Sequence, residues 1–156
     1  MINIDVISDS KNWSKKIKNP NIFFNTLAKV LPRKYRFTNK KVSLTILLSN
    51  NKNIKKLNKQ FRNKNKPTDV LSFPSEKKLN IKKSSYIGDV IISYEYMNKP
   101  KVLSNLEFKN KVAKIFIHSF LHLLGYDHIK LKDFNEMLIE EEKIYQTIET
   151  KIAKLA

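Results

Sequence analysis

Apolar and polar residues alternate along short segments of the chain, which is the period of a β-strand with one buried face. Residues 1–7 show this alternation, and residues 41–49 are rich in β-branched and aliphatic side chains. Two shorter apolar segments are bounded by Pro67, Pro74 and Gly88, and their shortness favours positions at an edge or a cleft. The pattern predicts four strands, at residues 1–7, 41–49, 70–73 and 87–92.

Apolar residues spaced three and four apart predict helices. The best defined begins at a capping box, in which the Ser104 hydroxyl accepts the backbone N–H of Glu107 and the Glu107 carboxylate reaches back. It ends near residue 124, where Gly125 can adopt the left-handed conformation that commonly terminates helices. The pattern predicts four helices, at residues 22–31, around 54–61, 104–124 and 133–152.

The order of these elements predicts an α+β fold, with a single small mixed β-sheet packed with helices. A chain of 156 residues with 41% hydrophobic residues can bury one core, and no linker or repeat divides it. We therefore expect one domain over residues 1–156. The first ten residues do not resemble a signal peptide, and no segment has the ~20 apolar residues of a membrane span. A cytoplasmic protein without a membrane partner is expected.

The cysteine content and the net charge limit the metal ligands and the partners that the chain can have. The absence of cysteine excludes a disulfide partner, thiolate catalysis and thiolate-bound zinc, so a metal ion must be held by histidine or carboxylates. The net charge of +17 favours a polyanionic partner such as nucleic acid. However, 28 lysines stand against three arginines, and such a bias also arises from an AT-rich genome. The charge alone leaves both explanations open.

The three histidines of the chain all lie in the segment H-S-F-L-H-L-L-G-Y-D-H. On the central helix, His118 and His122 are four residues apart and hence share one face. Gly125 then lets the chain turn, so that His128 can supply a third imidazole. Three neutral imidazoles leave one position open on a tetrahedral Zn²⁺, which is the arrangement of a catalytic site.

Two alternatives bear on this H-x3-H motif. The histidines could instead form a hydrogen-bonded polar stripe with Lys111 and Lys114. The spacing H-x3-H-x5-H also resembles the metzincin metalloproteases, which use H-E-x-x-H with glutamate as the general base. Here Ser119 occupies the place of that glutamate, so peptide hydrolysis by the same mechanism is not expected.

A longer set of motifs resembles the YbeY family across about residues 41–145. These motifs are L-N-K-Q-F-R-N-K-N-K-P-T-D-V-L-S-F-P at 57–74, I-G-D-V-I-I-S at 87–93 and the histidine segment. The resemblance implies a single-strand-specific, metal-dependent endoribonuclease that acts in ribosomal RNA maturation, at the 3′ end of the small-subunit RNA, and in ribosome quality control. Its implied partners are single-stranded RNA, ribosomal RNA and the small ribosomal subunit.

The resemblance also implies functional residues. One Zn²⁺ per chain would be held by His118, His122 and His128, and Arg62 matches the functionally important arginine of the family. The planar guanidinium of Arg62 would stabilise charge on phosphoryl oxygens. The family commonly has glycine directly after the first histidine, where this chain has Ser119.

The sequence leaves the roles of several other candidate functional residues open. Lys64 and Lys66 can hold phosphates or can be solvated surface lysines. Asp127 can orient a ligand imidazole or cap a helix end, and Asp89 can belong to a cleft or to a strand end. The acidic run at residues 140–142 is expected to be a solvated helix face.

Two other function classes also remain open. One is a zinc hydrolase acting on peptides or small molecules, and the other is a non-catalytic ribosome-assembly factor with a structural metal. No motif identifies a general base.

Overall fold

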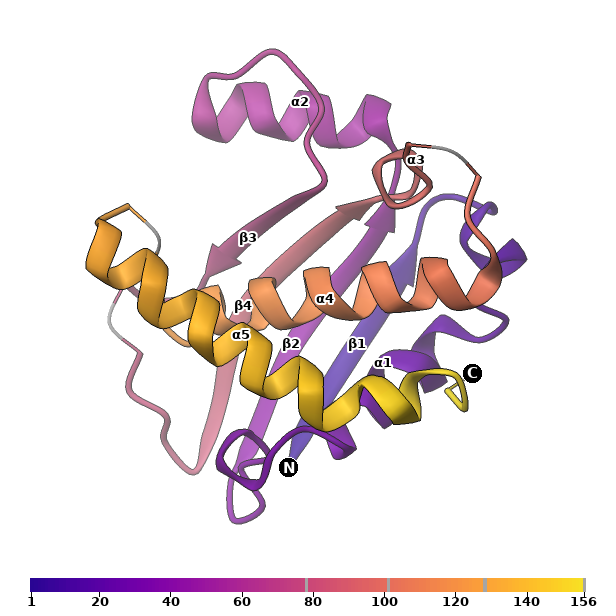
Figure 1. The fold of residues 1–156 in the computed structure, drawn as a ribbon. Helices are drawn as coiled ribbons and strands as arrows, with labels where there is room; N and C mark the ends of the chain where they lie inside the picture. Colours follow the sequence, from indigo (N-terminus) through magenta and orange to yellow (C-terminus); the bar gives the residue numbers. More distant parts are fainter. Residues whose placement is uncertain (78, 101, 128, 156) are drawn as a thin grey trace.

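A computed structural model describes residues 1–77, 79–100, 102–127 and 129–155 of the chain. Its centre is a four-stranded sheet in the order β1-β2-β4-β3 (Figure 1). The strands are β1 (Ile2–Ser8), β2 (Lys41–Ser49), β3 (Val70–Pro74) and β4 (Ser84–Ser93). Strands β1, β2 and β4 are parallel and β3 is antiparallel to β4. The predicted α+β class with one mixed sheet is confirmed.

Five α-helices lie in the described parts of the chain. They are α1 (Pro20–Lys29), α2 (Asn51–Arg62), α3 (Tyr94–Met97), α4 (Asn105–Leu123) and α5 (Leu131–Ile152). Short 3₁₀ helices occupy Trp13–Lys15 and Arg33–Tyr35. Within the described ranges, no helix combines the length and the apolarity that a membrane crossing requires.

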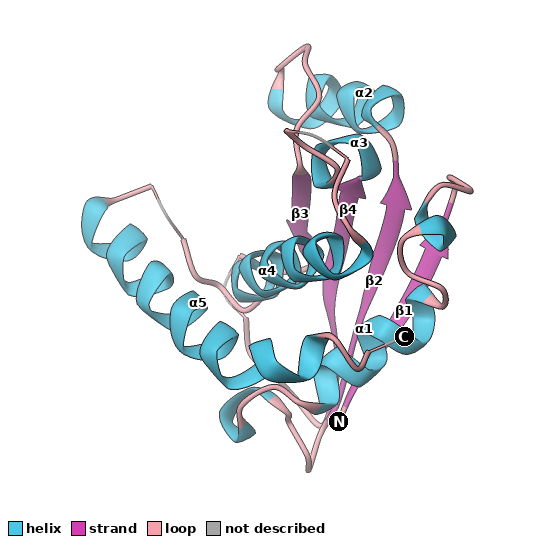
Figure 2. Ribbon diagram, turned by 45° about the vertical axis from the view of Figure 1, so that its right-hand side comes forward, coloured by secondary structure: helices cyan, strands magenta, loops and turns pink. Residues whose placement is uncertain are grey.

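The helices cover the sheet unequally (Figure 2). Helix α4 crosses one face, with α1 beside β1 on that same face and α5 packed against the outer side of α4. Helix α2 instead packs near the ends of the strands, where Ile54 joins Leu71 and Ile91 in a separate small apolar cluster. The rest of that second sheet face is more open, and Asn3 and Asp5 are exposed on it.

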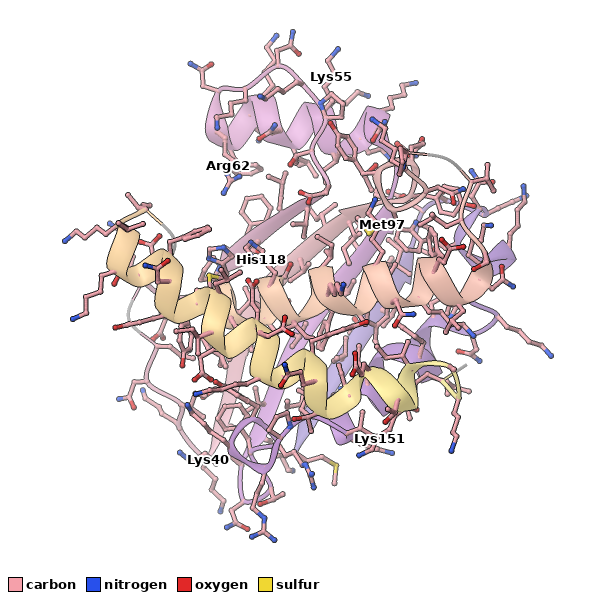
Figure 3. The ribbon with its side chains drawn as sticks, viewed as in Figure 1. Lys40, Lys55, Arg62, Met97, His118 and Lys151 are labelled. Carbon is pink, nitrogen blue, oxygen red and sulfur yellow. The ribbon has the colours of Figure 1, made fainter. Side chains whose placement is uncertain are left out.

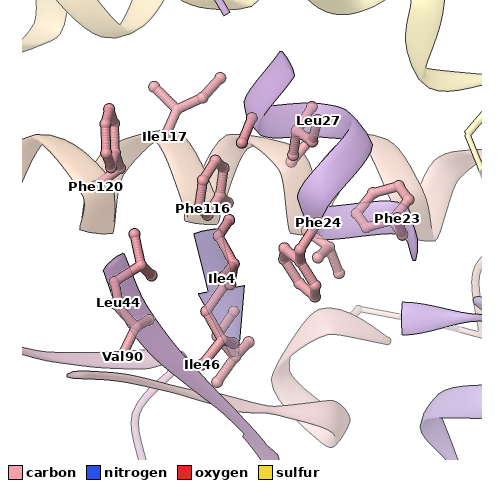
Figure 4. Packing of buried hydrophobic residues seen from close by; sticks show 14 of the residues in the cluster. Ile4, Phe23, Phe24, Leu27, Leu44, Ile46, Val90, Phe116, Ile117 and Phe120 are labelled. Carbon is pink, nitrogen blue, oxygen red and sulfur yellow. The ribbon is translucent and has the colours of Figure 1, made fainter. Parts of the chain in front are cut away.

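The main core lies between the sheet and helices α1 and α4 (Figure 4). Aliphatic residues of the strands, including Ile4, Leu44 and Ile46, are almost completely buried beneath aromatic rings of the helices. Phe24 of α1 meets Phe116 of α4 with ring centroids 5.8 Å apart in an edge-to-face arrangement. Burial of such large apolar side chains is the main force that fixes α4 over the sheet.

Strand β4 differs from the prediction. It is ten residues long and internal, so its predicted short edge or cleft position is wrong, whereas β3 does lie at an edge. Gly88 does not bound the strand but lies inside it, at a register irregularity, with φ +141°. A Cβ on Gly88 would lie 2.3 Å from the carbonyl oxygen of Phe73 and 2.8 Å from Leu123 Cδ2. The glycine therefore permits the close approach of β3 and α4 to β4.

Candidate active site

Helix α4 begins and ends as its sequence predicts. Both hydrogen bonds of the capping box are present. The Glu107 N–H donates to Ser104 Oγ at 3.2 Å, and the Ser104 N–H donates to Glu107 Oε1 at 3.3 Å. At the other end, Gly125 has φ +102°, and its N–H donates to the His122 carbonyl at 3.0 Å. The Tyr126 N–H donates to the Leu121 carbonyl at 3.0 Å, which completes a Schellman motif. This turn folds the backbone of Tyr126 back against the last turn of α4.

His118 and His122 lie near the carboxyl end of α4, and Figure 3 shows the position of His118. Their Nε2 atoms are 3.2 Å apart. The Nδ1 atom of His122 lies 3.0 Å from the Tyr126 carbonyl oxygen, and the Nδ1 atom of His118 lies 2.5 Å from Glu141 Oε1. The side chain of His118 is 30% exposed, so a ligand from solvent can reach it.

The partners of the two Nδ1 atoms determine what the Nε2 atoms can bind. A carbonyl and a carboxylate only accept hydrogen bonds, so both Nδ1 atoms carry protons in this network. In the neutral rings, the two Nε2 lone pairs then point to a shared region, where a cation is favourable. Two nitrogen ligands of tetrahedral zinc lie about 3.4 Å apart, given a Zn–N distance of about 2.1 Å. The observed 3.2 Å fits this arrangement, so His118 and His122 are suited to hold a divalent ion.

The predicted third ligand, His128, lies outside the described residues. Among the residues that are described, no group of three or more histidine, cysteine, aspartate or glutamate side chains is arranged to hold a metal ion. The complete ligand set therefore remains a prediction, and its observed part is the histidine pair of α4.

The acidic run of α5 is not simply a solvated helix face, so that expectation is wrong for two of its three residues. Glu141 contacts His118, and Glu140 accepts a hydrogen bond from the Tyr35 hydroxyl. This hydrogen bond lowers the pKa of Glu140, while burial and the same bond raise the pKa of Tyr35. Glu142 is exposed, as expected. Packing of α5 on α4 turns residues 140 and 141 inward, which the sequence of α5 alone does not show.

The two lysines of the alternative polar stripe have other partners in the described parts of the chain. Lys111 donates to the backbone carbonyls of Tyr96 and Lys99, each at 2.9 Å. The Lys114 ammonium lies 4.6 Å from the ring centroid of Tyr145. Both lysines therefore have contacts away from the two histidines.

Arg62 is the last residue of α2, and the helix ends there because Asn63 adopts the left-handed conformation with φ +56°. The chain beyond it folds back because Asn58 Nδ2 donates to the Lys66 carbonyl at 2.8 Å. A pocket of about 360 Å³ results. It is lined by Asn58, Arg62, Lys64, Lys66, Pro67, Thr68, Asp69 and Tyr96.

The structure thus brings the three predicted phosphate-binding residues, Arg62, Lys64 and Lys66, to one pocket. Neither His118 nor His122 lines this pocket. Figure 3 shows the Arg62 side chain directed from the end of α2 toward the side of the molecule on which His118 lies. The histidine pair and the Arg62 pocket are therefore two separate groups of residues.

The two ambiguous aspartates do not contact the histidine pair. Asp127 accepts the backbone N–H of Ile129 at 2.9 Å, which is a local turn contact. Asp89 lies within β4, exposed, and accepts a hydrogen bond from the Tyr86 hydroxyl. Ser119 is completely buried, and its hydroxyl has no partner among the described residues. The imidazoles of His118 and His122 are held by Glu141 and by the Tyr126 carbonyl.

Comparison with known proteins agrees with this arrangement of motifs. The sequence profile of the family described as endoribonuclease YbeY matches residues 7–149. An endoribonuclease YbeY from Pelagibacter ubique (strain HTCC1062) is 69% identical over 153 residues, covering 98% of this chain and 100% of that protein. Another from Persephonella marina is 36% identical over 114 residues, covering 72% of this chain and 74% of that protein.

The fold is shared with a solved structure. The solution structure of TM1509 from Thermotoga maritima superposes with a TM-score of 0.55 at 25% sequence identity, covering 97% of this chain and 93% of the other. The family match spans most of the chain, and the relative from Pelagibacter ubique matches along its whole length. The chain therefore belongs to the endoribonuclease YbeY family of enzymes.

Proposed function

We propose that this chain, acting as one domain in the cytoplasm, is a single-strand-specific, metal-dependent endoribonuclease. Its role is ribosomal RNA maturation, at the 3′ end of the small-subunit RNA, and ribosome quality control, with the small ribosomal subunit as its partner. Identity of 69% with a protein named endoribonuclease YbeY supports the reaction class. The observation that carries the metal dependence is the 3.2 Å separation of two imidazole nitrogens whose other ring nitrogens are both engaged.

One Zn²⁺ would be held by His118 and His122, with His128 as the third ligand. The bound ion would supply Lewis acidity to a scissile phosphodiester. Glu141 and the Tyr126 carbonyl keep both rings in the tautomer that offers Nε2 to the ion. Three imidazole ligands would leave one coordination position open, which is typical of a catalytic zinc site.

Phosphate recognition falls to the pocket at the end of α2. Arg62 can bind a phosphoryl group with two parallel N–H donors and stabilise charge that develops on its oxygens. Lys64 and Lys66 line the same pocket and add positive charge for the neighbouring phosphates. Within the described residues, no carboxylate forms an ion pair with Arg62, so its guanidinium is available to an anion.

The structure gives less support to peptide hydrolysis. Ser119, at the place of the metalloprotease glutamate, is buried and is not a carboxylate. Glu141 does not replace that base, because its carboxylate lies at Nδ1 of His118, on the other side of the ring from Nε2. A non-catalytic assembly factor would keep the metal but show no turnover.

The test is cleavage of one RNA sequence as a single strand and as a duplex, by wild type, His118→Ala, Arg62→Glu and Arg33→Glu. Arg33 is an exposed arginine in a separate turn and provides the matched charge-reversal control. We expect wild type and Arg33→Glu to cleave only the single strand, and the other two variants to be inactive. Retained activity in Arg62→Glu would exclude its role, and metal-bound wild type without turnover would favour an assembly factor.

A further inference from the structure

The apolar stripe of α2 extends beyond the part of the helix that the sheet covers. Ile54 is completely buried, Leu57 is half-buried, and Phe61 is 59% exposed. These residues occupy one face of the helix at spacings of three and four. Exposure therefore increases toward the carboxyl end of α2, beside the edge strand β3.

The exposed ring of Phe61 has a fixed neighbour. It meets the ring of Phe73, on β3, with centroids 5.2 Å apart at an interplanar angle of 65°. Phe73 is half-buried and packs against the small apolar cluster of Ile54, Leu71 and Ile91, so its ring gives Phe61 a fixed packing surface. An edge-to-face contact engages one part of each ring, and it leaves most of the Phe61 surface available.

The helix that carries this ring bears charges of one sign, although Asp69 lines the Arg62 pocket and Asp89 is paired with Phe73 in the sheet. Residues 50–68, which include α2 and the turn after it, contain no acidic residue. They contain seven cationic residues, namely Lys52, Lys55, Lys56, Lys59, Arg62, Lys64 and Lys66. An exposed aromatic ring next to cationic side chains is the combination that binds single-stranded nucleic acids, since bases stack on the ring and phosphates meet the charges.

We propose that Phe61, supported by Phe73, is a stacking platform for one unpaired base of the RNA, while Arg62 binds an adjacent phosphate. This inference rests on the proposed function, and it names how that site selects single strands. A base in a duplex is already stacked on both faces, so it cannot cover the ring. The platform is thus a specificity-determining element that acts before the scissile phosphate reaches the histidine pair.

The experiment measures binding without cleavage, in the His118→Ala background, to two ten-nucleotide RNA strands. One strand has all its bases, and the other is abasic at every position but has the same number of phosphates. Phe61→Leu keeps apolar contact with Phe73 but removes the ring, while Phe61→Tyr keeps the ring. We expect Phe61→Leu to weaken binding of the complete strand by about 5- to 100-fold. Phe61→Tyr should bind like the parent, and the abasic strand should not distinguish the variants.

A fluorescent reporter provides a second measurement. Phe61→Trp should lose emission when the complete single strand binds, and it should become protected from acrylamide. Leu106→Trp is the control, because Leu106 is similarly exposed at 48% and lies in the first turn of α4. It is twelve residues from His118, or about 18 Å along the helix. Its emission should not change.

Several results would overturn the platform. Equal affinity of Phe61→Leu and the parent for the complete strand would exclude it, as would an equal loss with the abasic strand. If the indole of the Phe61→Trp variant is protected without RNA, in a manner that depends on protein concentration, position 61 contacts a second copy of the chain instead. If wild type cleaves single strands while Phe61→Leu does so with unchanged KM, the platform fails and the proposed function stands. If base-dependent binding is seen without any cleavage by wild type, the platform stands and the proposed function fails.

Discussion

The Glu141–His118 contact should control metal affinity. The carboxylate lies 2.5 Å from Nδ1 of His118 and is 25% exposed, so solvent screens the contact only in part. Glu141→Gln keeps the shape but replaces a charged acceptor with a neutral amide, which can also rotate its NH₂ group toward the ring. Charge-assisted hydrogen bonds are about twice as strong as neutral ones. Loss of a partner that orients a metal-binding histidine typically weakens metal affinity by about 10- to 100-fold.

The measurement is a zinc titration in competition with a chromophoric chelator at pH 7.5, which gives the Kd of each variant. The expected loss corresponds to about 1.4–2.8 kcal/mol of binding free energy. Glu142→Gln is the matched control, because Glu142 is the adjacent exposed glutamate and accepts a hydrogen bond from Gln146 on its own helix. If Glu141→Gln and Glu142→Gln bind zinc with the same Kd as wild type, the assigned orientation of His118 is refuted.

Three further predictions concern stability. Gly88→Ala should lower the free energy of unfolding by more than about 2 kcal/mol in urea titrations, since its Cβ would meet the Phe73 carbonyl at 2.3 Å. Glu140→Gln should be less stable than wild type at neutral pH. That difference should be fully present above pH 4.5 and disappear as the pH falls further, because the folded state lowers the pKa of Glu140. Ser119→Ala should raise the free energy of unfolding by about 1 kcal/mol, since it removes a buried hydroxyl without a partner.

Controls for these variants come from the same chain. Gly125→Ala should cost less than Gly88→Ala, because a Cβ at Gly125 meets nothing within 4 Å, although its φ of +102° is still unfavourable. An equal loss at both glycines would show that backbone strain, and not the close approach of β3, dominates. A constant difference between Glu140→Gln and wild type from pH 7 to pH 3 would contradict the hydrogen bond to Tyr35. A less stable Ser119→Ala would show that the hydroxyl has a partner.

Local signals allowed much of the fold to be predicted. The capping box at Ser104, the left-handed Gly125 and the apolar periods of the strands each depend on a few neighbouring residues, and the structure confirms them. The prediction for β4 was wrong because Gly88 was interpreted as a strand end. A glycine with positive φ can instead form an irregularity within a strand. The single turn of α3 has too few residues to produce a period, so it was not predicted.

Only part of the histidine site could be predicted from the sequence. The spacing of His118 and His122 placed both on one helical face, and the structure brings their Nε2 atoms within 3.2 Å. The contact of Glu141 with His118 could not be predicted, because it spans 23 residues and depends on how α5 crosses α4. The run of three glutamates was compatible with a solvated face until packing distinguished its members. The role of His128 remains a prediction from the motif.

The most direct test of the metal centre is the zinc content of the purified chain, measured by native mass spectrometry together with cleavage of a single-stranded RNA. We predict one zinc ion per wild-type chain, loss of that ion in His118→Ala, His122→Ala and His128→Ala, and loss of cleavage in parallel. A folded wild-type chain that binds no stoichiometric metal, or that cleaves RNA equally well after its metal is removed, would contradict a reaction centred on these histidines.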